Sequence, residues 1–370
     1  MKIIFFCGTL QSGKDGVGDY TLQLAEELSK RGHLVNIVAL NDKYAEEDCD
    51  SNKLAERISI RIIRLSALSQ WKSRLKKATE IVVEFNPDWI SLQFVPYAYN
   101  NKGLPFNLPY NLKSVFNGHK VHVMYHELWV ENRDIKGKLL AFLQRKLIGF
   151  LHKMLAPQLS HTHVPVYAQR LRLIGVKAKA LPVFSNIPNI KTNINHIEGS
   201  FTVGFFSQVT YRKEIIEFLK NLSVGCVNKN LKLNIVVIGG TYNKVEKFIE
   251  QINALENMDC TVRHTGFLDS DNVSMALSNC NIGITPVPRH LLGKSGSVAA
   301  FLSHGIPVAA PFIKEGYENM DVGFFDQDIV SAIISDANFS CIATAAKKAV
   351  EISSRVTPKA VTNNFSIDLS

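Results

Sequence analysis

Short apolar segments alternate with helix-patterned segments along almost the whole chain. The strand-like segments lie at residues 2–7, 34–40, 58–65, 89–94, 120–126, 201–206, 233–238, 260–264, 281–285 and 306–310. Strands that are mostly apolar and are separated by helices are typical of parallel sheets with helices on both faces. The alternation therefore predicts an α/β fold, and the length of 370 residues favours two domains of this kind.

The two halves are separated by a stretch without periodicity. Residues 186–200 carry turn formers and indicate a linker. We therefore expect one doubly wound, Rossmann-like domain over 1–185 and a second over 201–354, followed by a tail over 355–370 that packs back on the first domain. Residues 96–118 look like a loop, residues 135–156 like a long basic helix, and Pro358 is expected to break a helix over about 341–354.

Composition narrows the class of protein. With 46% hydrophobic and 20% charged residues the chain is globular, and its apolar runs are too short to span a membrane. The N-terminus looks like a first strand that ends in a glycine loop, not like a signal peptide. The six cysteines form no Cys-x-x-Cys pair, and no histidine pair has zinc spacing, so we expect reduced thiols, no metal and a cytoplasmic location.

The positive charge is concentrated in the first half. Residues 1–185 contain 26 Lys and Arg against 16 Asp and Glu, whereas the rest contains 16 against 17. This asymmetry leaves two interpretations open. One is a basic surface without a specific partner, and the other is contact with an anionic partner such as the inner face of a membrane or an acidic glycan. No aromatic-interleaved basic stretch or zinc finger indicates nucleic acid.

A glycine-rich turn, Gly13-Lys14-Asp15-Gly16-Val17-Gly18-Asp19-Tyr20, connects the first strand to the first helix. Backbone N–H groups and a helix N-terminus at such a turn favour an anion. A P-loop is disfavoured because Asp15 stands where Ser or Thr would hold magnesium. A dinucleotide fingerprint is disfavoured because Thr21 replaces its third glycine.

The turn continues as Gly-Val-Gly-Asp-Tyr-Thr, then Leu-Ala-Glu-Glu-Leu and Arg31-Gly32-His33. This opening resembles that of GT-B glycosyltransferases of the family 4 kind (glycosyl transferases group 1). The resemblance implies two Rossmann-like domains facing a central cleft, with the acceptor on the N-terminal domain and the nucleotide sugar on the C-terminal one. It places Gly16 and Gly18 by the donor phosphate and makes Asp19 an acceptor-side base if the enzyme inverts.

A second loop, Tyr125-His126-Glu127, follows a strand at the end where ligands bind in such sheets. A histidine there can donate a hydrogen bond to a sugar hydroxyl or act as a base. Its position resembles that of the family's donor-sugar histidine, so His126 and Glu127 are further candidate catalytic residues. The alternative is a histidine that only caps its own loop. The aromatic residues of the loop from 91 to 106 could stack on an acceptor sugar or form a folded lid.

The second half carries candidate phosphate ligands. Arg212 and Lys213 start a predicted helix, where two cations oppose the helix dipole unless an anion is present. The resemblance assigns this pair to the donor diphosphate and the Gly266-Phe267 turn to the nucleobase. Other groups suited to phosphate are Gly240 in a second glycine turn, and Lys294, Ser295, Gly296 and Ser297 at a helix start.

The chain departs from the family at one motif. Alignment on Gly305-Ile306-Pro307-Val308 places Leu292 and Ala300 where family 4 carries a Glu-x7-Glu pair. Without these carboxylates the donor, a UDP- or GDP-sugar, and the stereochemical course stay open.

We therefore predict a metal-independent hexosyltransferase-like glycosyltransferase (EC 2.4) without a cofactor. It would move a sugar from a nucleotide sugar to a hydroxyl on a glycan or lipid-linked acceptor, in bacterial surface polysaccharide or glycoconjugate synthesis. The alternatives are a non-catalytic nucleotide-sugar-binding protein and a sugar-nucleotide epimerase or hydrolase of the same fold.

Overall fold

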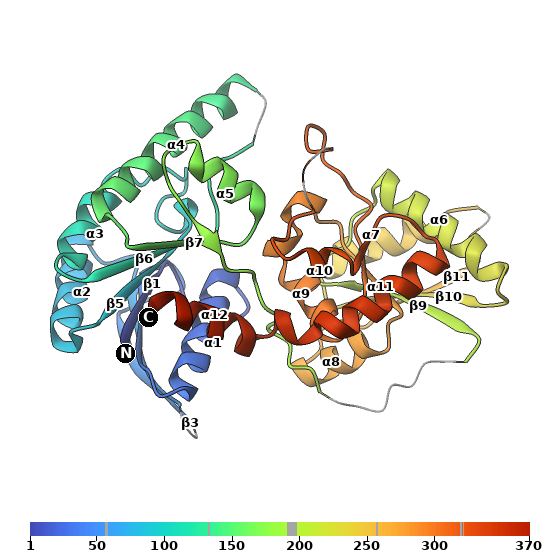
Figure 1. Ribbon diagram of the computed structural model, residues 1–370, viewed down its shortest axis with the longest axis horizontal. Helices are drawn as coiled ribbons and strands as arrows, with labels where there is room; N and C mark the ends of the chain where they lie inside the picture. The colour runs from blue at the N-terminus through green and yellow to red at the C-terminus, as the bar shows by residue number, and fades with distance from the viewer. Residues whose placement is uncertain (56–57, 132–133, 191–197, 257, 319, 321) are drawn as a thin grey trace. The chain divides into compact units, whose positions relative to one another are not determined.

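The computed structural model describes residues 1–55, 58–131, 134–190, 198–256, 258–318, 320 and 322–370. The chain divides into two compact units (Figure 1). The first comprises residues 1–163, 167–181 and 362–370, and the second comprises residues 164–166 and 182–361. Part of the predicted linker, residues 191–197, lies outside the described residues.

The first unit is built on an eight-stranded sheet of order β3-β4-β2-β1-β5-β6-β7-β8. Its strands are β1 (Lys2–Cys7), β2 (Leu34–Asp42), β3 (Cys49–Ala55), β4 (Ile58–Ser66), β5 (Trp89–Phe94), β6 (Lys120–Tyr125), β7 (Leu159–Thr162) and β8 (Lys179–Ala180). All neighbours pair in parallel except β3, which pairs antiparallel with β4 at the sheet edge. The strand order reverses between β1 and β5, which is where ligands bind in doubly wound sheets.

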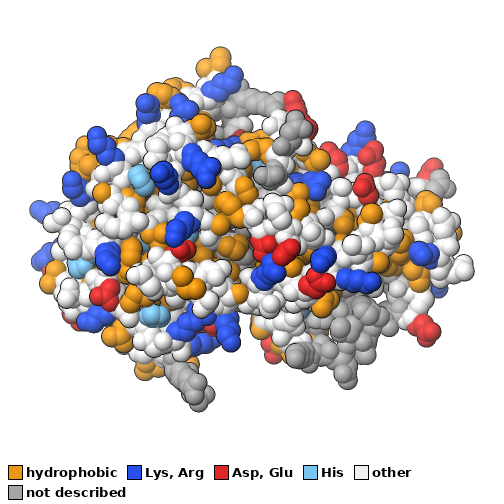
Figure 2. Space-filling model, viewed as in Figure 1, with side chains coloured by type: hydrophobic (Ala, Val, Ile, Leu, Met, Phe, Trp, Pro, Cys, Tyr) orange, Lys and Arg blue, Asp and Glu red, His pale blue; other side chains and the backbone are white. Residues whose placement is uncertain are grey.

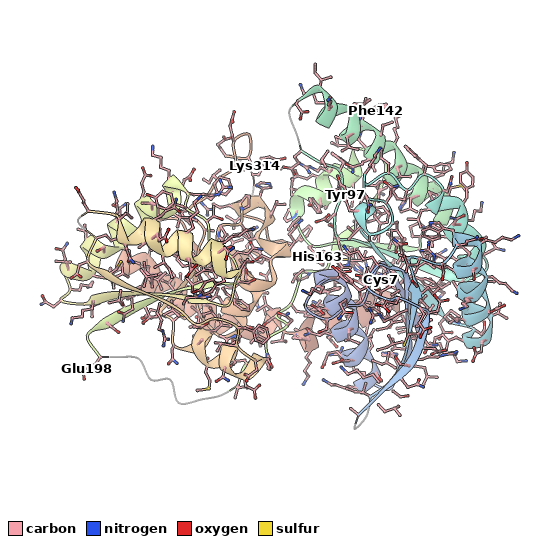
Figure 3. The ribbon with its side chains drawn as sticks, turned by 180° about the vertical axis from the view of Figure 1, so that it is seen from behind. Cys7, Tyr97, Phe142, His163, Glu198 and Lys314 are labelled. Carbon is pink, nitrogen blue, oxygen red and sulfur yellow. The ribbon has the colours of Figure 1, made fainter. Side chains whose placement is uncertain are left out.

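Helices cover both faces of this sheet, with α2, α3 and α4 on one face and α1 and α12 on the other (Figure 1). Their bounds are α1 (Gly16–Lys30), α2 (Trp71–Phe85), η1 (Pro96–Ala98), α3 (Leu108–Phe116), α4 (Ile135–Leu155), α5 (Pro165–Arg172) and α12 (Pro358–Leu369). Side chains on β1 are buried on both faces, and Figure 3 labels Cys7 at the carboxyl end of that strand. This burial explains the unbroken apolar run of the sequence.

The second unit has a six-stranded sheet of order β11-β10-β9-β12-β13-β14 in which every neighbouring pair is parallel. Its elements are β9 (Ser200–Phe206), α6 (Lys213–Val227), β10 (Lys232–Ile238), α7 (Tyr242–Asn253), β11 (Cys260–His264), α8 (Ser270–Ser278), β12 (Ile282–Ile284), η2 (Arg289–Lys294), α9 (Gly296–Ser303), β13 (Val308–Ala309), α10 (Gln327–Val330), β14 (Ile333–Ile334), α11 (Phe339–Ile352) and η3 (Ser353–Val356). Alternating residues of β10 belong to two apolar clusters, with Ile235 and Val237 in one and Val236 and Ile238 in the other. Each face of this sheet therefore has its own core.

The structure corrects three sequence expectations. The presumed loop over 96–118 contains helix α3, whose first turn holds Pro109; proline suits that turn because its missing N–H would have no partner there. The tail, for which no helix was predicted, forms α12, which begins at Pro358. The exposed strand β3 has no apolar pattern and was not expected; it is held by backbone pairing to β4.

The C-terminal turns of α12 complete the core of the first unit. Phe365 is fully buried and its ring centre lies 6.2 Å from that of Phe5 on β1. The indole N–H of Trp89 donates a hydrogen bond to the carbonyl oxygen of Leu369 (3.0 Å).

Basic side chains are frequent on the first unit. Figure 2 shows Lys and Arg interspersed with hydrophobic side chains where Figure 1 draws α2, α3 and α4. No described helix is long and apolar enough to cross a membrane.

Candidate functional site

The glycine-rich turn links the central strand β1 to α1. Asp15 is the N-cap of α1: its carboxylate accepts hydrogen bonds from the N–H of Val17 (3.1 Å) and the hydroxyl of Thr9 (2.5 Å). The helix N-terminus therefore already holds a negative charge of the chain, which lowers its attraction for a phosphate. The assignment of Gly16 and Gly18 to donor phosphate stays a prediction.

Gly18 has a packing reason to be glycine. A Cβ atom at this position would lie 2.6 Å from the carbonyl oxygen of Thr9, which is shorter than a van der Waals contact. The first turn of α1 thus packs against the backbone of the turn that precedes it.

Asp19 lies in the first turn of α1 and both its oxygens face the N–H of Gly13 (3.3 and 3.2 Å). Burial raises the pKa of Asp19; the Gly13 N–H opposes this shift and the Asp15 carboxylate adds to it. A carboxylate with a raised pKa is a better proton acceptor than an ordinary one, which suits the predicted role as base.

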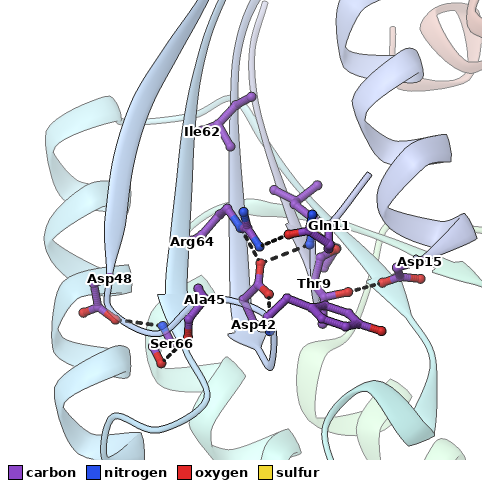
Figure 4. Close-up of polar contacts among 12 residues, drawn as sticks. Thr9, Gln11, Asp15, Asp42, Ala45, Asp48, Ile62, Arg64 and Ser66 are labelled. Carbon is purple, nitrogen blue, oxygen red and sulfur yellow. Dashed lines mark hydrogen bonds and ion pairs between the residues drawn. The ribbon is translucent and has the colours of Figure 1, made fainter. Parts of the chain in front are cut away.

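Figure 4 shows how the turn is fixed from β2 and β4. Asp42 is fully buried and accepts hydrogen bonds from the side chain of Arg64 (2.7 Å) and from the N–H groups of Tyr44 (3.0 Å) and Leu10 (3.2 Å). Arg64 also donates to the side chain of Gln11 (3.0 Å). This ion pair, in which only the carboxylate is fully buried, holds residues 10 and 11 against the sheet and so sets the path of the glycine turn.

His126 directly follows β6, at the carboxyl end of the strand. Its ring is buried, its Nε2 lies 2.8 Å from the amide oxygen of Gln93, and its Nδ1 lies 2.8 Å from Nε2 of His163, the residue that Figure 3 labels. The ring of Tyr20 on α1 packs nearly perpendicular to the rings of both histidines. Both ring nitrogens of His126 therefore have protein partners, and Glu127 beside it is half-buried.

The sequence did not predict this histidine cluster. His122, His161 and His163 occupy single positions in apolar strands and look unrelated along the chain. The available signal was their alternation: polar residues two or four apart on β5, β6 and β7 fall on one face of a sheet.

A pocket of 610 Å³ lies between the N-terminal ends of α2 and α3. Its walls include Trp71, Tyr99 and Phe106, with amide side chains from Asn100 and Asn107. Aromatic faces together with amide groups suit a sugar, which presents C–H faces and hydroxyls. Phe106 was expected on the acceptor side, whereas Trp71 was not singled out.

In the second unit, Arg212 is the N-cap residue of α6 and is exposed. Its guanidinium carbon lies 4.0 Å from the ring centre of Phe312, which follows β13. Lys213 lies 3.7 Å from a carboxylate oxygen of Glu217. Glu214 in the first turn of α6 offsets the helix dipole, so these cations need no external anion for stability.

Two glycine turns follow the next strands of this sheet. Gly240, after β10, has a φ of 94° and packs close to the carbonyl oxygen of Ser207. Gly266, after β11, has a φ of 67°, which favours glycine. Phe267 next to it is 97% exposed, so its ring is free to contact a planar base.

Residues 294–297 form the start of α9. Ser295 is the N-cap: its hydroxyl accepts from the N–H of Val298 (3.4 Å) and lies 3.0 Å from the hydroxyl of Ser297. Lys294 precedes it and Gly296 opens the helix. These residues are half-buried and bring two hydroxyls, a cation and helix N–H groups together, a combination suited to phosphate.

The two positions aligned with the missing glutamates are core positions. Leu292 and Ala300 are both fully buried in the same apolar cluster, together with Phe324 and Val308. A carboxylate at either site would be surrounded by hydrocarbon.

Within each unit, the predicted residues gather at the carboxyl ends of its strands. Asp19 follows β1 and His126 follows β6 in the first unit; Arg212, Gly240, Gly266 and Lys294 follow β9 to β12 in the second. Across the described part of the chain, no three His, Cys, Asp or Glu side chains are arranged to hold a metal ion.

No protein-family model matches the sequence, and no curated protein matches it. Solved structures match over the full length. The lipopolysaccharide outer core galactosyltransferase WaaB has a TM-score of 0.57 at 9% identity, covering 99% of this chain and 98% of that chain. WaaG, a glycosyltransferase involved in lipopolysaccharide biosynthesis, has a TM-score of 0.58 at 12% identity, with 99% of each chain covered. A candidate UDP-N-acetylglucosamine 2-epimerase from Listeria monocytogenes has a TM-score of 0.51 at 11% identity, covering 99% of this chain and 94% of that chain.

At these identities the matches show the fold. The chain has the GT-B fold, with two Rossmann-like units, which confirms the predicted fold class and fits the family 4 resemblance.

Proposed function

We propose that this protein is a glycosyltransferase that moves a sugar from a nucleoside-diphosphate sugar to a hydroxyl of a glycan or lipid-linked acceptor. The observation that carries the proposal is the set of phosphate-suited groups at the strand ends of the second unit: the exposed Arg212, the Gly240 turn and the 294–297 helix start. Fold alone does not separate transfer from epimerisation, because structures described with either activity match the chain.

The proposed chemistry needs no metal. Cationic side chains and helix N–H groups of the second unit would stabilise the negative charge that develops on the leaving diphosphate. In the first unit, Asp19 has a raised pKa and would accept the acceptor's proton if the reaction inverts the sugar. If the reaction retains configuration, Asp19 would only position the acceptor.

Two structural neighbours and one pocket bear on the acceptor and its pathway. WaaB and WaaG are described as enzymes of lipopolysaccharide synthesis, which favours bacterial surface glycan synthesis in the cytoplasm. The pocket between α2 and α3, with its aromatic and amide walls, is our candidate for acceptor contact.

Thermal shift with UDP, GDP and their sugars tests donor binding, because a ligand that binds only the folded state raises the melting temperature. We expect Lys294→Ala to abolish the shift and the control Lys220→Ala, an exposed lysine further along α6, to keep it. An equal shift in both variants would contradict the phosphate site.

Turnover separates the alternatives. Transfer predicts that nucleoside diphosphate is released from the nucleotide sugar only when a glycan acceptor is present. Release or isomerisation without acceptor would support a hydrolase or epimerase, and binding without turnover with any acceptor would support a non-catalytic protein.

We also propose that α4 contacts an anionic membrane surface. Ile135, Leu139 and Phe142 are exposed on it by 86%, 59% and 46%, among exposed Lys and Arg side chains. Such a mixture suits the interface of an anionic bilayer. Leu139→Ser should reduce co-sedimentation with vesicles that contain phosphatidylglycerol. Val224→Ser, at a 60% exposed site on α6, should not, and equal binding of the two variants would refute the contact.

A further inference from the structure

A continuous chain of buried hydrogen bonds runs along one face of the first sheet. Its side chains come from neighbouring parallel strands and share a face because the register pairs Ser91 with His122 and Met124 with His161. The members are Ser91, Gln93, His122, His126, His161 and His163, each no more than 6% exposed. Phe365 of α12 covers one end of this network and Tyr20 of α1 the other.

Seven contacts join the network, all between 2.8 and 3.0 Å. They are Leu181 O to His163 Nδ1, His163 Nε2 to His126 Nδ1, His126 Nε2 to Gln93 Oε1, Gln93 Nε2 to Ser91 Oγ, Ser91 Oγ to His122 Nδ1, His122 Nε2 to His161 Nδ1, and His161 Nε2 to Asp368 Oδ2.

Both ends of the network are acceptors. At one end is the carbonyl oxygen of Leu181, which has no proton to give. At the other end is the carboxylate of Asp368, which also accepts from Lys179. Burial raises the pKa of Asp368, but the hydrogen bonds from Lys179 and His161 outweigh this and hold the pKa below its ordinary value. Asp368 is therefore ionised.

Seven hydrogen bonds require seven protons. Each neutral histidine supplies one, the Ser91 hydroxyl supplies one, and the Gln93 amide places one in the chain, whichever way the amide is turned. Neutral side chains thus supply six. In a fully neutral network, two lone pairs would face each other at one of the seven contacts.

We propose that this network binds one proton beyond those of its neutral residues, so that one of its four histidines is an imidazolium. The proton comes from solvent when the unit folds. No other change in covalent structure is involved.

The amide of Gln93 decides which end carries the charge. As it stands, Gln93 donates to Ser91 and accepts from His126, so every bond on the Asp368 side is satisfied by neutral rings. The extra proton then belongs to the His126–His163 pair. With the amide reversed, the neutral rings are His126 and His163, and the charge lies on the two histidines nearest Asp368.

Burial opposes a charge on any of these rings. Burial lowers the pKa of His122, and the neighbouring His161 lowers it further. Burial also lowers the pKa of His161; there Asp368 opposes the shift, whereas Lys179 adds to it. Of these two rings His161 is the one that contacts a carboxylate, so in the reversed state His161 carries the charge.

This inference deepens the proposed function and rests on it in one respect. A movable positive charge at His126 would lie at the same edge of the sheet as Asp19, the proposed base, and Gln93 and Asp368 would be positioning residues for it. The number of protons in the network does not depend on a bound nucleotide sugar and can be measured without one.

Nitrogen NMR of the intact chain with ¹⁵N-labelled histidine measures the count directly. At pH 7.5 we expect one solvent-protected ring with both nitrogens protonated. If all four network rings are neutral, the proposal is wrong.

Native electrophoresis at pH 7.5 gives an independent test, because mobility follows net charge. In Asp368→Asn the new amide donates the seventh proton, so the network loses its imidazolium as the chain loses a carboxylate. The mobility should stay unchanged, whereas Asp50→Asn, at an exposed carboxylate, should shift it by one positive charge. An equal shift in both variants would overturn the proposal.

Gln93→Glu changes the count in the other direction. An ionised carboxylate accepts with both oxygens, which leaves five protons for seven bonds, so a second imidazolium should appear in the NMR spectrum. A protonated carboxyl supplies one proton, as the amide does, and keeps one imidazolium, so a spectrum with none in this variant would contradict the counting. Absence of glycosyl transfer in the unaltered protein, with the imidazolium present in its spectrum, would count against the proposed function alone.

Discussion

Leu292→Glu restores one of the two acidic residues that the sequence lacks relative to family 4, and the structure predicts that it destabilises the second unit. Leu292 is 0% exposed inside an apolar cluster. Losing the burial of its side chain costs about 2 kcal/mol.

The carboxyl group adds a pH-dependent cost. In apolar surroundings its pKa rises by roughly 3 units above an unfolded value of about 4.3. At pH 7 this shift corresponds to about 4 kcal/mol. The total of about 6 kcal/mol is comparable to the whole stability of many domains.

The raised pKa of the new carboxyl group determines how the loss of stability changes with pH. Below the unfolded pKa the carboxyl is protonated in both states, so only the packing loss remains. As the pH rises above that value, the unfolded chain ionises first and the variant loses stability until the folded pKa is passed. The deficit should therefore be smaller at pH 5 than at pH 8.

Urea unfolding followed by circular dichroism measures the deficit, and hydrogen exchange over residues 282–303 locates it. Tryptophan fluorescence does not serve here, because Trp71, Trp89 and Trp129 all belong to the first unit. Leu292→Met is the matched control, with an expected loss below about 1.5 kcal/mol. If the two variants unfold alike at pH 8, position 292 is not a core site and a glutamate there could still reach a donor.

Three further predictions concern the first unit. Gly18→Ala should lower the free energy of unfolding by about 2 kcal/mol, measured by urea unfolding followed by fluorescence, because its Cβ would lie 2.6 Å from the carbonyl oxygen of Thr9. An unchanged midpoint would show that the turn moves aside without a loss of stability. Burial raises the pKa of Asp42, but the hydrogen bonds from Arg64 and two N–H groups outweigh burial and lower the pKa. The stability that Asp42 contributes is therefore present above about pH 4 and is lost as the pH falls through the lowered pKa. Asp42→Asn should remove this acid dependence from the unfolding midpoint. Trp89→Phe removes one buried hydrogen bond, worth about 1 kcal/mol, and should speed hydrogen exchange in residues 362–370, whereas unchanged exchange would mean that the indole bond does not hold the helix.

The sequence predicted the elements that carry strong periodicity. The apolar run of β1 and the helical spacing of α1 fixed both elements and the turn between them, because buried parallel strands leave an unbroken apolar signature. It did not predict α3, since its Asn and Pro residues also mark loops, nor β3, which is exposed along its length.

Site residues could be predicted only where a reactive or phosphate-binding side chain stands beside a turn that the sequence itself reveals. Asp19 and the start of α9 stand next to recognisable turns. The histidine network could not be predicted, because a register between β5, β6 and β7 brings together residues up to 72 positions apart. Leu292 shows the opposite case: motif alignment marks a site position, and packing makes it part of the core.

The contribution of residues 362–370 to the first unit has a consequence for synthesis on the ribosome. Phe365 and Leu369 fill a core whose strands emerge hundreds of residues earlier, while every residue of the second unit has been made by position 361. The unit that begins first is therefore completed last. Until those residues emerge, the nascent chain exposes the apolar surface around Phe5 and Trp89, and a chain cut short before them would be a substrate for chaperones and proteases.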